Sequence, residues 1–485
     1  MIKFFPALLA LIGLAWGCSA VGPNYKRVDP PVPAKFGSLE RGISTGESLN
    51  AELLGSWWKI FRDPALNSLT ERAVKGNLDL RIAAARVRQA RALSLASESK
   101  NYPEGQFSGG YQRQRRTESG LSGQTSGVSG GLSSLSAGLG ERETDLFLTG
   151  FDASWEIDVF GGIRREVEAS QADLAASEEA LRNALVTLQG EVARNYIELR
   201  GQQLRLKIAR KEVEIRKENL ELIDARLRAG LVNELDLARG KGELASAESR
   251  IPLLENSLRG SFHRLAVLLG QEPLSLVGEL EMEMQLPEVP ENIPAGLPSD
   301  LLRRRPDIRH AERELAASTA RIGVSTAELF PKFSLTGSFG YQGTKLEDLP
   351  RESSNFWRIG PSFRWSILNF KRITANVEVN KAAREEALAR YEKSVLNSLE
   401  EVENSLVALA REKLRTEALA EAVKANALAF ELAMERYKAG VQSYLEVLDA
   451  ETALYNGQDQ LAQSQQNRVL ALISLYKALG GGWME

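Results

Sequence analysis

The chain has 485 residues, of which 43% are hydrophobic and 26% are charged, with 61 Lys and Arg against 64 Asp and Glu. A net charge of −3 gives no basic excess for binding phosphate, so we expect no nucleic-acid partner. A single Cys and two His, His263 and His310, exclude an internal disulfide and a Cys-based zinc site. We therefore expect neither a bound metal nor another cofactor.

The first residues have the pattern of a bacterial export signal. Lys3 precedes a short apolar run that ends at Gly17-Cys18 and is too short to cross a membrane as a helix. The sequence Ala15-Trp16-Gly17-Cys18 is similar to the lipobox of bacterial lipoproteins. We predict a signal peptide over 1–17 and a lipid anchor at Cys18. An ordinary signal peptide with a chance Cys is the alternative.

The chain repeats itself. Arg226-Leu227-Arg228-Ala229-Gly230-Leu231 is similar to Arg436-Tyr437-Lys438-Ala439-Gly440-Val441, 210 residues later. Further upstream the offset becomes 228, because the first copy holds an insertion rich in Ser and Gly between Thr117 and Gly140. We predict an extended segment over 18–63, a first repeat over 64–270, a linker over 271–298, a second repeat over 299–480 and a tail over 481–485.

Each repeat contains two segments in which apolar and polar residues alternate. These segments lie near 104–115, 145–160, 331–343 and 355–369. In the second of them, Phe147, Phe151 and Trp155 alternate with Asp152 and Glu156. Alternation over about ten residues with aromatic ends is typical of membrane β-strands, which face lipid on one side and water on the other. A half-buried sheet in a soluble sandwich is the alternative.

The number of strands predicts an oligomer. Four strands cannot close a barrel, and a bilayer does not tolerate open sheet edges. Bacterial barrels begin at eight strands. Two chains would supply eight strands and three chains twelve, and the strand count leaves both possibilities open.

The rest of the chain is predicted to be helical. Segments 162–229 and 372–439 contain no Pro, and about 68 residues of helix measure about 100 Å. Heptad-like apolar spacing indicates coiled-coil packing. Each long helix should reverse at a glycine such as Gly230, followed by a return helix, with a kink at Pro252 in the first copy. The fold class is mainly α with a membrane β portion, and closing such units around a ring would join a β-barrel to a helical tube.

No catalytic motif stands in a convincing context. The sequence has no P-loop and no G-x-G-x-x-G between a strand and a helix. Carboxylates are abundant, and we expect them on the solvated surfaces of helices. We expect that the protein is not an enzyme.

Several motifs together resemble the outer membrane factor (TolC) family, in particular its lipoprotein branch, which serves resistance-nodulation-division efflux systems. The motifs that carry the resemblance are Cys18-Ser19-Ala20-Val21-Gly22-Pro23-Asn24-Tyr25, Trp57-Trp58-Lys59, Leu302-Arg303-Arg304-Arg305-Pro306-Asp307, Phe330-Pro331-Lys332-Phe333 and Leu479-Gly480-Gly481-Gly482-Trp483. The resemblance implies a homotrimer in the outer membrane with a 12-stranded β-barrel continuous with a 12-helix periplasmic α-barrel. It also implies a periplasmic adaptor (membrane fusion) protein and an inner-membrane transporter as partners. The channel would be a passive exit duct for drugs or other small toxic compounds.

The resemblance also implies a gate. Tyr437, Leu445 and Asp449 match the periplasmic gate, where Leu445 and Asp449 would form the constriction and Tyr437 would hold the closed state. Leu445 and Asp449 are four residues apart and so lie on one helix face. In the alternative, Leu445 belongs to a coiled-coil core and Asp449 is solvated or a cap.

The two helix reversals are the predicted docking surface for the adaptor. They contain Arg228 and Gly230 in the first copy and Lys438 and Gly440 in the second. The reason is their position in the chain, which places them farthest from the strands.

Three other functions remain open from sequence. An outer-membrane conduit of a type I protein secretion system and a heavy-metal efflux channel would use the same architecture. A coiled-coil lipoprotein without a pore would not need the four alternating segments. The lipobox-like Cys18 and the Gly-Gly-Gly-Trp ending favour the efflux branch.

Overall fold

The structure is a computed structural model that describes residues 20–37, 43–44, 54–115, 143–290, 293–294 and 297–483. The predicted signal peptide, Cys18 and the Ser/Gly-rich insertion lie outside the described residues. Contacts within the chain divide it into two compact units. The first, called the strand unit, comprises the described residues within 1–26, 90–173 and 315–386. The second, called the helix unit, comprises those within 27–89, 174–314 and 387–485.

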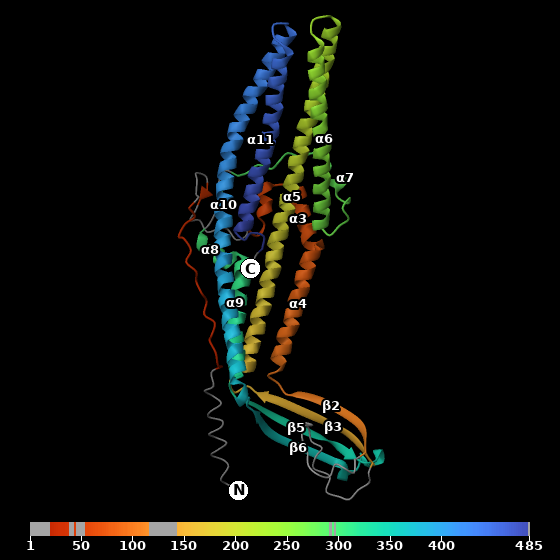
Figure 1. Cartoon of the computed structure of the whole chain (residues 1–485), viewed down its shortest axis with the longest axis vertical. Coiled ribbons are helices and arrows are strands. Elements are labelled where there is room, and N and C mark those ends of the chain that lie inside the picture. Colours follow the sequence, from red (N-terminus) through yellow and green to blue (C-terminus); the bar gives the residue numbers. More distant parts are fainter. Residues whose placement is uncertain are drawn as a thin grey trace. The chain divides into compact units, whose positions relative to one another are not determined.

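The strand unit contains one antiparallel sheet of four strands, visible in Figure 1. The strands are β2 (Glu104–Arg115), β3 (Glu143–Ile157), β5 (Lys332–Gly343) and β6 (Asn355–Arg364), in the order β2-β3-β5-β6. Each repeat supplies one hairpin, and the two hairpins pair through β3 and β5.

The register of the sheet separates an aromatic face from a polar face. Phe107 pairs with Phe151, Phe151 with Phe339, and Phe339 with Trp357, so four aromatic residues form one row across all four strands. All four side chains are more than half exposed. The neighbouring row is polar and consists of Gln106, Asp152, Ser338 and Arg358. Because paired residues share a face and successive residues alternate, the two rows lie on opposite faces.

The last strand is shorter than the alternation suggests. Arg364 pairs with Lys332, which is the first residue of β5, so the residues after Arg364 pair with no strand in the part of the chain that the structure describes. The chain instead makes a short 3-10 turn, η5 (Ile367–Asn369), and enters α10 (Phe370–Lys438).

The helical part of the strand unit comes from four helices. They are the end of α4 (Leu78–Ser99), the start of α5 (Gly162–Arg228), the end of α9 (Pro306–Ala327) and the start of α10. Polar contacts join them. The Nε2 of Gln171 donates to Glu98 at 2.9 Å, and Arg321 pairs with Asp173.

The helix unit is built around two helical hairpins. One joins α5 to α6 (Glu234–Leu268), and the other joins α10 to α11 (Tyr444–Ala478). Shorter elements complete the unit: η1 (Trp57–Phe61), α3 (Pro64–Gly76), α7 (Val277–Leu280) and α8 (Pro298–Arg304). A two-stranded parallel pair joins β1 (Ile43–Ser44) to β4 (Ile293–Pro294). Pro252 lies inside α6, whose bounds run through it.

The core of the helix unit brings the segment around Trp57 together with the C-terminal end of the described chain. The ring of Trp57 stacks on that of Tyr476, with centroids 5.7 Å apart, and the amide of Gly482 donates to the carbonyl of Leu54 at 2.8 Å. Asp63 begins α3 by accepting from the amides of Ala65 and Leu66. Its other oxygen accepts a 2.5 Å hydrogen bond from the hydroxyl of Tyr196 in α5.

Among the described residues, no helix is both long and apolar enough to cross a membrane.

Candidate functional site at the tips of the helical hairpins

The two helical hairpins reverse through the same backbone turn. After α5, the amide of Leu231 donates to the carbonyl of Arg226 at 2.9 Å, and Gly230 has a φ of 71°. After α10, the amide of Val441 donates to the carbonyl of Arg436 at 3.1 Å, and Gly440 has a φ of 77°. A positive φ costs glycine little, which explains why both copies place glycine at this point.

The predicted docking residues all lie in these turns. Arg228, Gly230, Lys438 and Gly440 are exposed. Apart from the adjoining residues of the turn, no atom of the described residues lies within 4 Å of the place where a Cβ on Gly230 or Gly440 would stand. Two apolar side chains, Leu231 and Val441, are also exposed beside them. Each tip is therefore an open surface with an apolar and a basic component.

A small apolar core joins the two hairpins just below the tips. It consists of Ile223, Ala433, Tyr437, Tyr444, Val447 and Leu448. The rings of Tyr437 and Tyr444 have centroids 5.5 Å apart. Tyr437 is buried, and its hydroxyl has no hydrogen-bond partner among the described residues. Both hairpins contribute to this core, which packs them against each other.

A guanidinium links the first hairpin to the second. Arg226, near the end of α5, donates to the carbonyl oxygens of Tyr437 and Lys438, each at 2.7 Å. Its Cζ also lies 4.5 Å from the centroid of the Tyr437 ring. Those carbonyls belong to the last turn of α10, where the carbonyl of Tyr437 also accepts from the amide of Gly440 at 2.9 Å, and a cation is favourable at this end of a helix.

Leu445 and Asp449 lie on the opposite side of α11 from this core. The buried stripe of the first turns is formed by Tyr444, Val447, Leu448 and Glu451. Leu445 is 43% exposed, and Asp449 is exposed as well. The structure thus brings both residues to one free helix face, whereas Tyr437 lies in the core between the hairpins. Leu445 does not belong to the coiled-coil core of its own chain.

Sequence reasoning missed a buried polar cluster further along the hairpins. Glu451 of α11 is fully buried, and its Oε1 accepts a 3.3 Å hydrogen bond from Asn219 of α5. Arg216 of α5 is also buried and pairs with Glu212 and with Glu243 of α6. Burial raises the pKa of Glu451 to about 7, with Arg216 opposing the rise and Glu212 adding to it. The expectation that carboxylates stay solvated is wrong for Glu212 and Glu451, because packing of the hairpins encloses them.

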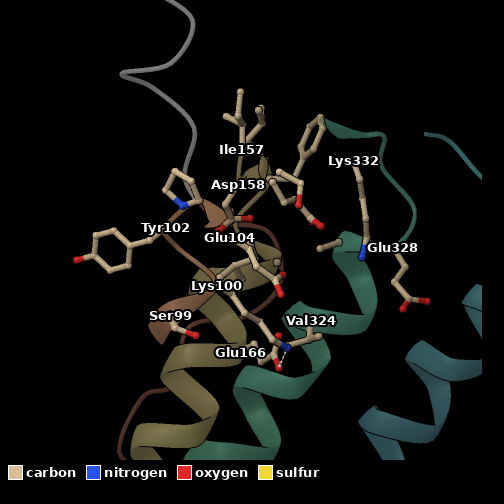
Figure 2. A pocket seen from close by; sticks show the side chains of 18 of the residues that line it. Ser99, Lys100, Tyr102, Glu104, Ile157, Asp158, Glu166, Val324, Glu328 and Lys332 are labelled. Carbon is tan, nitrogen blue, oxygen red and sulfur yellow. Dashed lines mark hydrogen bonds and ion pairs between the residues drawn. The ribbon is translucent and has the colours of Figure 1, made fainter. Parts of the chain in front are cut away.

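A cavity of about 740 Å³ lies in the strand unit, where the strands meet the helices (Figure 2). Its charged lining consists of Lys100, Glu104, Glu156, Asp158, Glu166, Glu328 and Lys332. Lys100 points toward Glu166 in Figure 2 and pairs with it at 2.5 Å. The excess of carboxylates over lysines gives the cavity a negative potential. None of these residues was predicted as a site residue from the sequence, although Lys332 belongs to the motif Phe330-Pro331-Lys332-Phe333 and Glu156 to the alternation of β3.

Comparison with known proteins identifies the family. A family model described as "Outer membrane efflux protein" matches residues 69–271 and 297–481, one match in each repeat. Nodulation protein T of Rhizobium leguminosarum bv. trifolii is 32% identical over 480 residues, which cover 99% of this chain and 96% of that protein. Solvent efflux pump outer membrane protein SrpC of Pseudomonas putida is 32% identical over 479 residues, covering 98% and 97%. The solved outer-membrane channel OprN is 34% identical, with a TM-score of 0.86 over 96% of this chain and 99% of that one.

These matches cover both repeats and confirm a mainly helical tandem-repeat fold of the TolC-like channel type. The family consists of channel proteins, which confirms the expectation that the chain is not an enzyme. Its members are outer-membrane components of efflux pumps, in which they work with an adaptor and an inner-membrane transporter. The chain belongs to the outer membrane efflux protein family.

Proposed function

We propose that three copies of the chain form a passive exit duct through the outer membrane, with a 12-stranded β-barrel continuous with a 12-helix periplasmic α-barrel. The observation that carries this proposal is the sheet: β2 and β6 each pair on one side only within the described residues. A bilayer requires every backbone polar group to be satisfied, so each open edge needs a strand from another copy. Two copies would give eight strands, but trimers are typical of the solved channels that the chain resembles.

The two faces of the sheet support this arrangement. The row of Phe107, Phe151, Phe339 and Trp357 suits contact with lipid, and the row of Gln106, Asp152, Ser338 and Arg358 suits a water-filled lumen. Native mass spectrometry of the detergent-extracted protein tests the stoichiometry. Three chains are expected, and a monomer or dimer would contradict the proposal.

Tyr437, Leu445 and Asp449 form the periplasmic gate in this proposal. Three copies would bring the exposed Leu445 and Asp449 faces together at the axis, as an apolar ring beside an acidic ring. An apolar constriction resists wetting, and an acidic ring favours cations. Tyr437 holds the closed state through Arg226, which ties its carbonyl and ring to the other hairpin.

The hairpin tips are the proposed docking surface for a periplasmic adaptor protein, with Arg228, Gly230, Lys438 and Gly440 in contact. Their exposure and their open surroundings support this assignment. A photo-crosslinking residue at Lys438 should capture the adaptor in cells, and the same residue at Lys345, outside the helix unit, should not. Capture from Lys345 alone would contradict the assignment. An inner-membrane resistance-nodulation-division transporter supplies the energy.

We propose the same division of the chain into segments that the sequence patterns predict. Residues 1–17 are removed as a signal peptide, Cys18 carries the lipid, and 18–63 form an extended segment. The repeats cover 64–270 and 299–480, with a linker over 271–298 and a tail over 481–485. Mass analysis of the N-terminal peptide tests whether Cys18 is lipidated. An unmodified Cys18 would contradict the lipid anchor.

The proposed cargo is drugs or other small toxic compounds. SrpC, which the chain matches over nearly its whole length, is a solvent efflux component, and a duct of this kind does not need a substrate pocket. Cells that lack the protein should accumulate more ethidium than cells complemented with the wild-type gene. Equal ethidium with a defect in export of a metal ion or of a protein would favour the heavy-metal or type I secretion alternatives.

A further inference from the structure

The N-terminal segment Ala20–Tyr25, called the strap, lies against the turn between β3 and α5. The amide of Val21 donates to the carbonyl of Phe160 at 3.0 Å. A Cβ added to Gly161, which has a φ of 79°, would stand 2.4 Å from the Cβ of Ala20. Only glycine at position 161 permits both this conformation and this approach.

The strap also touches the backbone of α9. A Cβ on Gly22 would lie 2.5 Å from the Cα of Gly323, and a Cβ on Gly323 would lie 2.9 Å from the carbonyl oxygen of Val21. Gly22 has a φ of 89°. Gly22, Gly161 and Gly323, called the glycine notch, therefore let three backbones meet where any larger residue would separate them.

One buried arginine holds the strap in the notch. The Nε of Arg165 donates to the carbonyl of Val21 at 3.1 Å, and its Nη2 donates to Oδ1 of Asn24 at 2.6 Å. The same Nη2 reaches the carbonyls of Ala20 and Gly22 at 3.4 Å. Its Nη1 pairs with Glu168 at 2.6 Å. The side chain is only 5% exposed, so these bonds offset the cost of burying a guanidinium.

We propose that Arg165 and the glycine notch are a positioning site that holds the lipid-bearing end of the chain at the β3–α5 junction. Ala20 follows Cys18 by two residues, which span at most about 7 Å. β3 ends at Ile157, and Phe160 stacks on Phe330 with centroids 4.6 Å apart at the same junction. Aromatic pairs at strand ends suit the boundary between lipid and water. The acyl chains therefore enter the bilayer beside the strands of their own chain instead of diffusing around them. This inference rests on the lipidation of Cys18 in the proposed function.

A photoreactive fatty acid incorporated in cells tests the position of the acyl chains. After illumination, crosslinked peptides of the wild-type protein should come from the β3–α5 junction and from the start of β5. In Arg165→Gln, crosslinks to bulk lipid should replace these crosslinks to the protein. Arg165→Lys should restore part of the crosslinks to the protein. Arg164→Gln is the matched control, because Arg164 is the half-exposed neighbour that pairs with Asp158, and it should leave the crosslinks unchanged. Heat-resistant oligomers on gels must be retained by each variant, which shows that the channel still assembles.

The outcomes test two things separately: the contact of Arg165 with the strap, called the clamp, and the lipid on Cys18. The same crosslinks in Arg165→Gln as in the wild type, or wild-type crosslinks far from the junction, would overturn the positioning site. A Cys18 without label would overturn the lipidation and, with it, the lipid role of the clamp. Hydrogen exchange at the amide of Val21 then decides whether the clamp exists: protection lost in Arg165→Gln and kept in Arg164→Gln shows the clamp, and equal protection rules it out.

Discussion

Arg226 reaches across from the first helical hairpin to Tyr437 of the second, with 2.7 Å between a guanidinium nitrogen and the Tyr437 carbonyl oxygen and 4.5 Å between Cζ and the ring centroid. A second nitrogen donates to the carbonyl of Lys438. This single side chain therefore ties the end of α10 to the end of α5, beside the residues proposed to close the tube.

Removing this link should favour opening. Arg226→Ala loses two charge-assisted hydrogen bonds and a cation–π contact, which together weaken the closed tip by about 1–3 kcal/mol per chain. Cells with this variant should become more sensitive to vancomycin, which is too large to cross an intact outer membrane. Lys211→Ala removes an exposed pair with Glu214 on the same helix, away from the tips, and is the control. Equal sensitivity of the two variants would show that the link does not restrain the gate.

Asp63 should stabilise the helix unit through its contacts with α3 and with Tyr196 of α5. Asp63→Ala removes the cap of α3 and leaves the buried hydroxyl of Tyr196 without its acceptor, at a cost of about 2–4 kcal/mol. The midpoint of heat denaturation should fall accordingly.

A comparison of variants identifies the cause of that loss. Asp79→Ala, at the exposed start of α4, should change the midpoint little. In the double variant with Tyr196→Phe, Asp63→Ala should cost less than it does alone, because no hydroxyl is left unpaired. Full additivity of the two changes would show that the hydrogen bond contributes nothing.

Glu451 should make the packing of the hairpins depend on pH. Burial raises its pKa from 4.5 to about 7. The packed state therefore binds the proton more tightly than a state in which Glu451 is hydrated, so the stabilisation is complete below about pH 4.5 and is lost as pH rises through 7. Glu451→Gln keeps the shape without the charge, and at pH 8 it should stabilise the hairpins by at most about 3 kcal/mol per chain.

The measurement is the denaturation midpoint of the wild type and Glu451→Gln at pH 5 and pH 8. The difference between the two proteins should be small at pH 5 and large at pH 8. Glu446→Gln, on the exposed side of the same helix, should behave as the wild type does. A difference that does not change with pH would mean that Glu451 does not titrate in this range.

Patterns along the chain predicted the strands well because each strand is long and has one polar face. The alternation around Phe151 and Asp152 becomes the aromatic and polar rows of the sheet. The same reasoning placed Gly230 and Gly440 in the turns, since their conformation depends on local geometry. The alternation predicted a strand up to about residue 369, but β6 ends at Arg364, which is the last of its residues described as paired with another strand. Pairing depends on the neighbouring strand and is not a local property.

Contacts between distant segments could not be predicted in this way. Arg165 belongs to a charged helix start and has no sequence signal that distinguishes it from Arg164, yet packing buries it against the strap. Glu451 likewise falls among ordinary surface residues in the sequence, and only the approach of α5 encloses it. Both positions depend on which helices meet, which a single sequence does not specify.

Single-channel recording in a planar bilayer tests most directly whether the protein forms a channel that is gated by Leu445 and Asp449. The purified wild-type protein should give small, discrete conductance steps. Leu445→Ala combined with Asp449→Ala removes both proposed rings and should raise the conductance several-fold, while Leu235→Ala, at the matching place in the first repeat, should not. An unchanged conductance in the double variant would remove both residues from the gate, and a protein that gives no discrete steps in any form would contradict the channel itself.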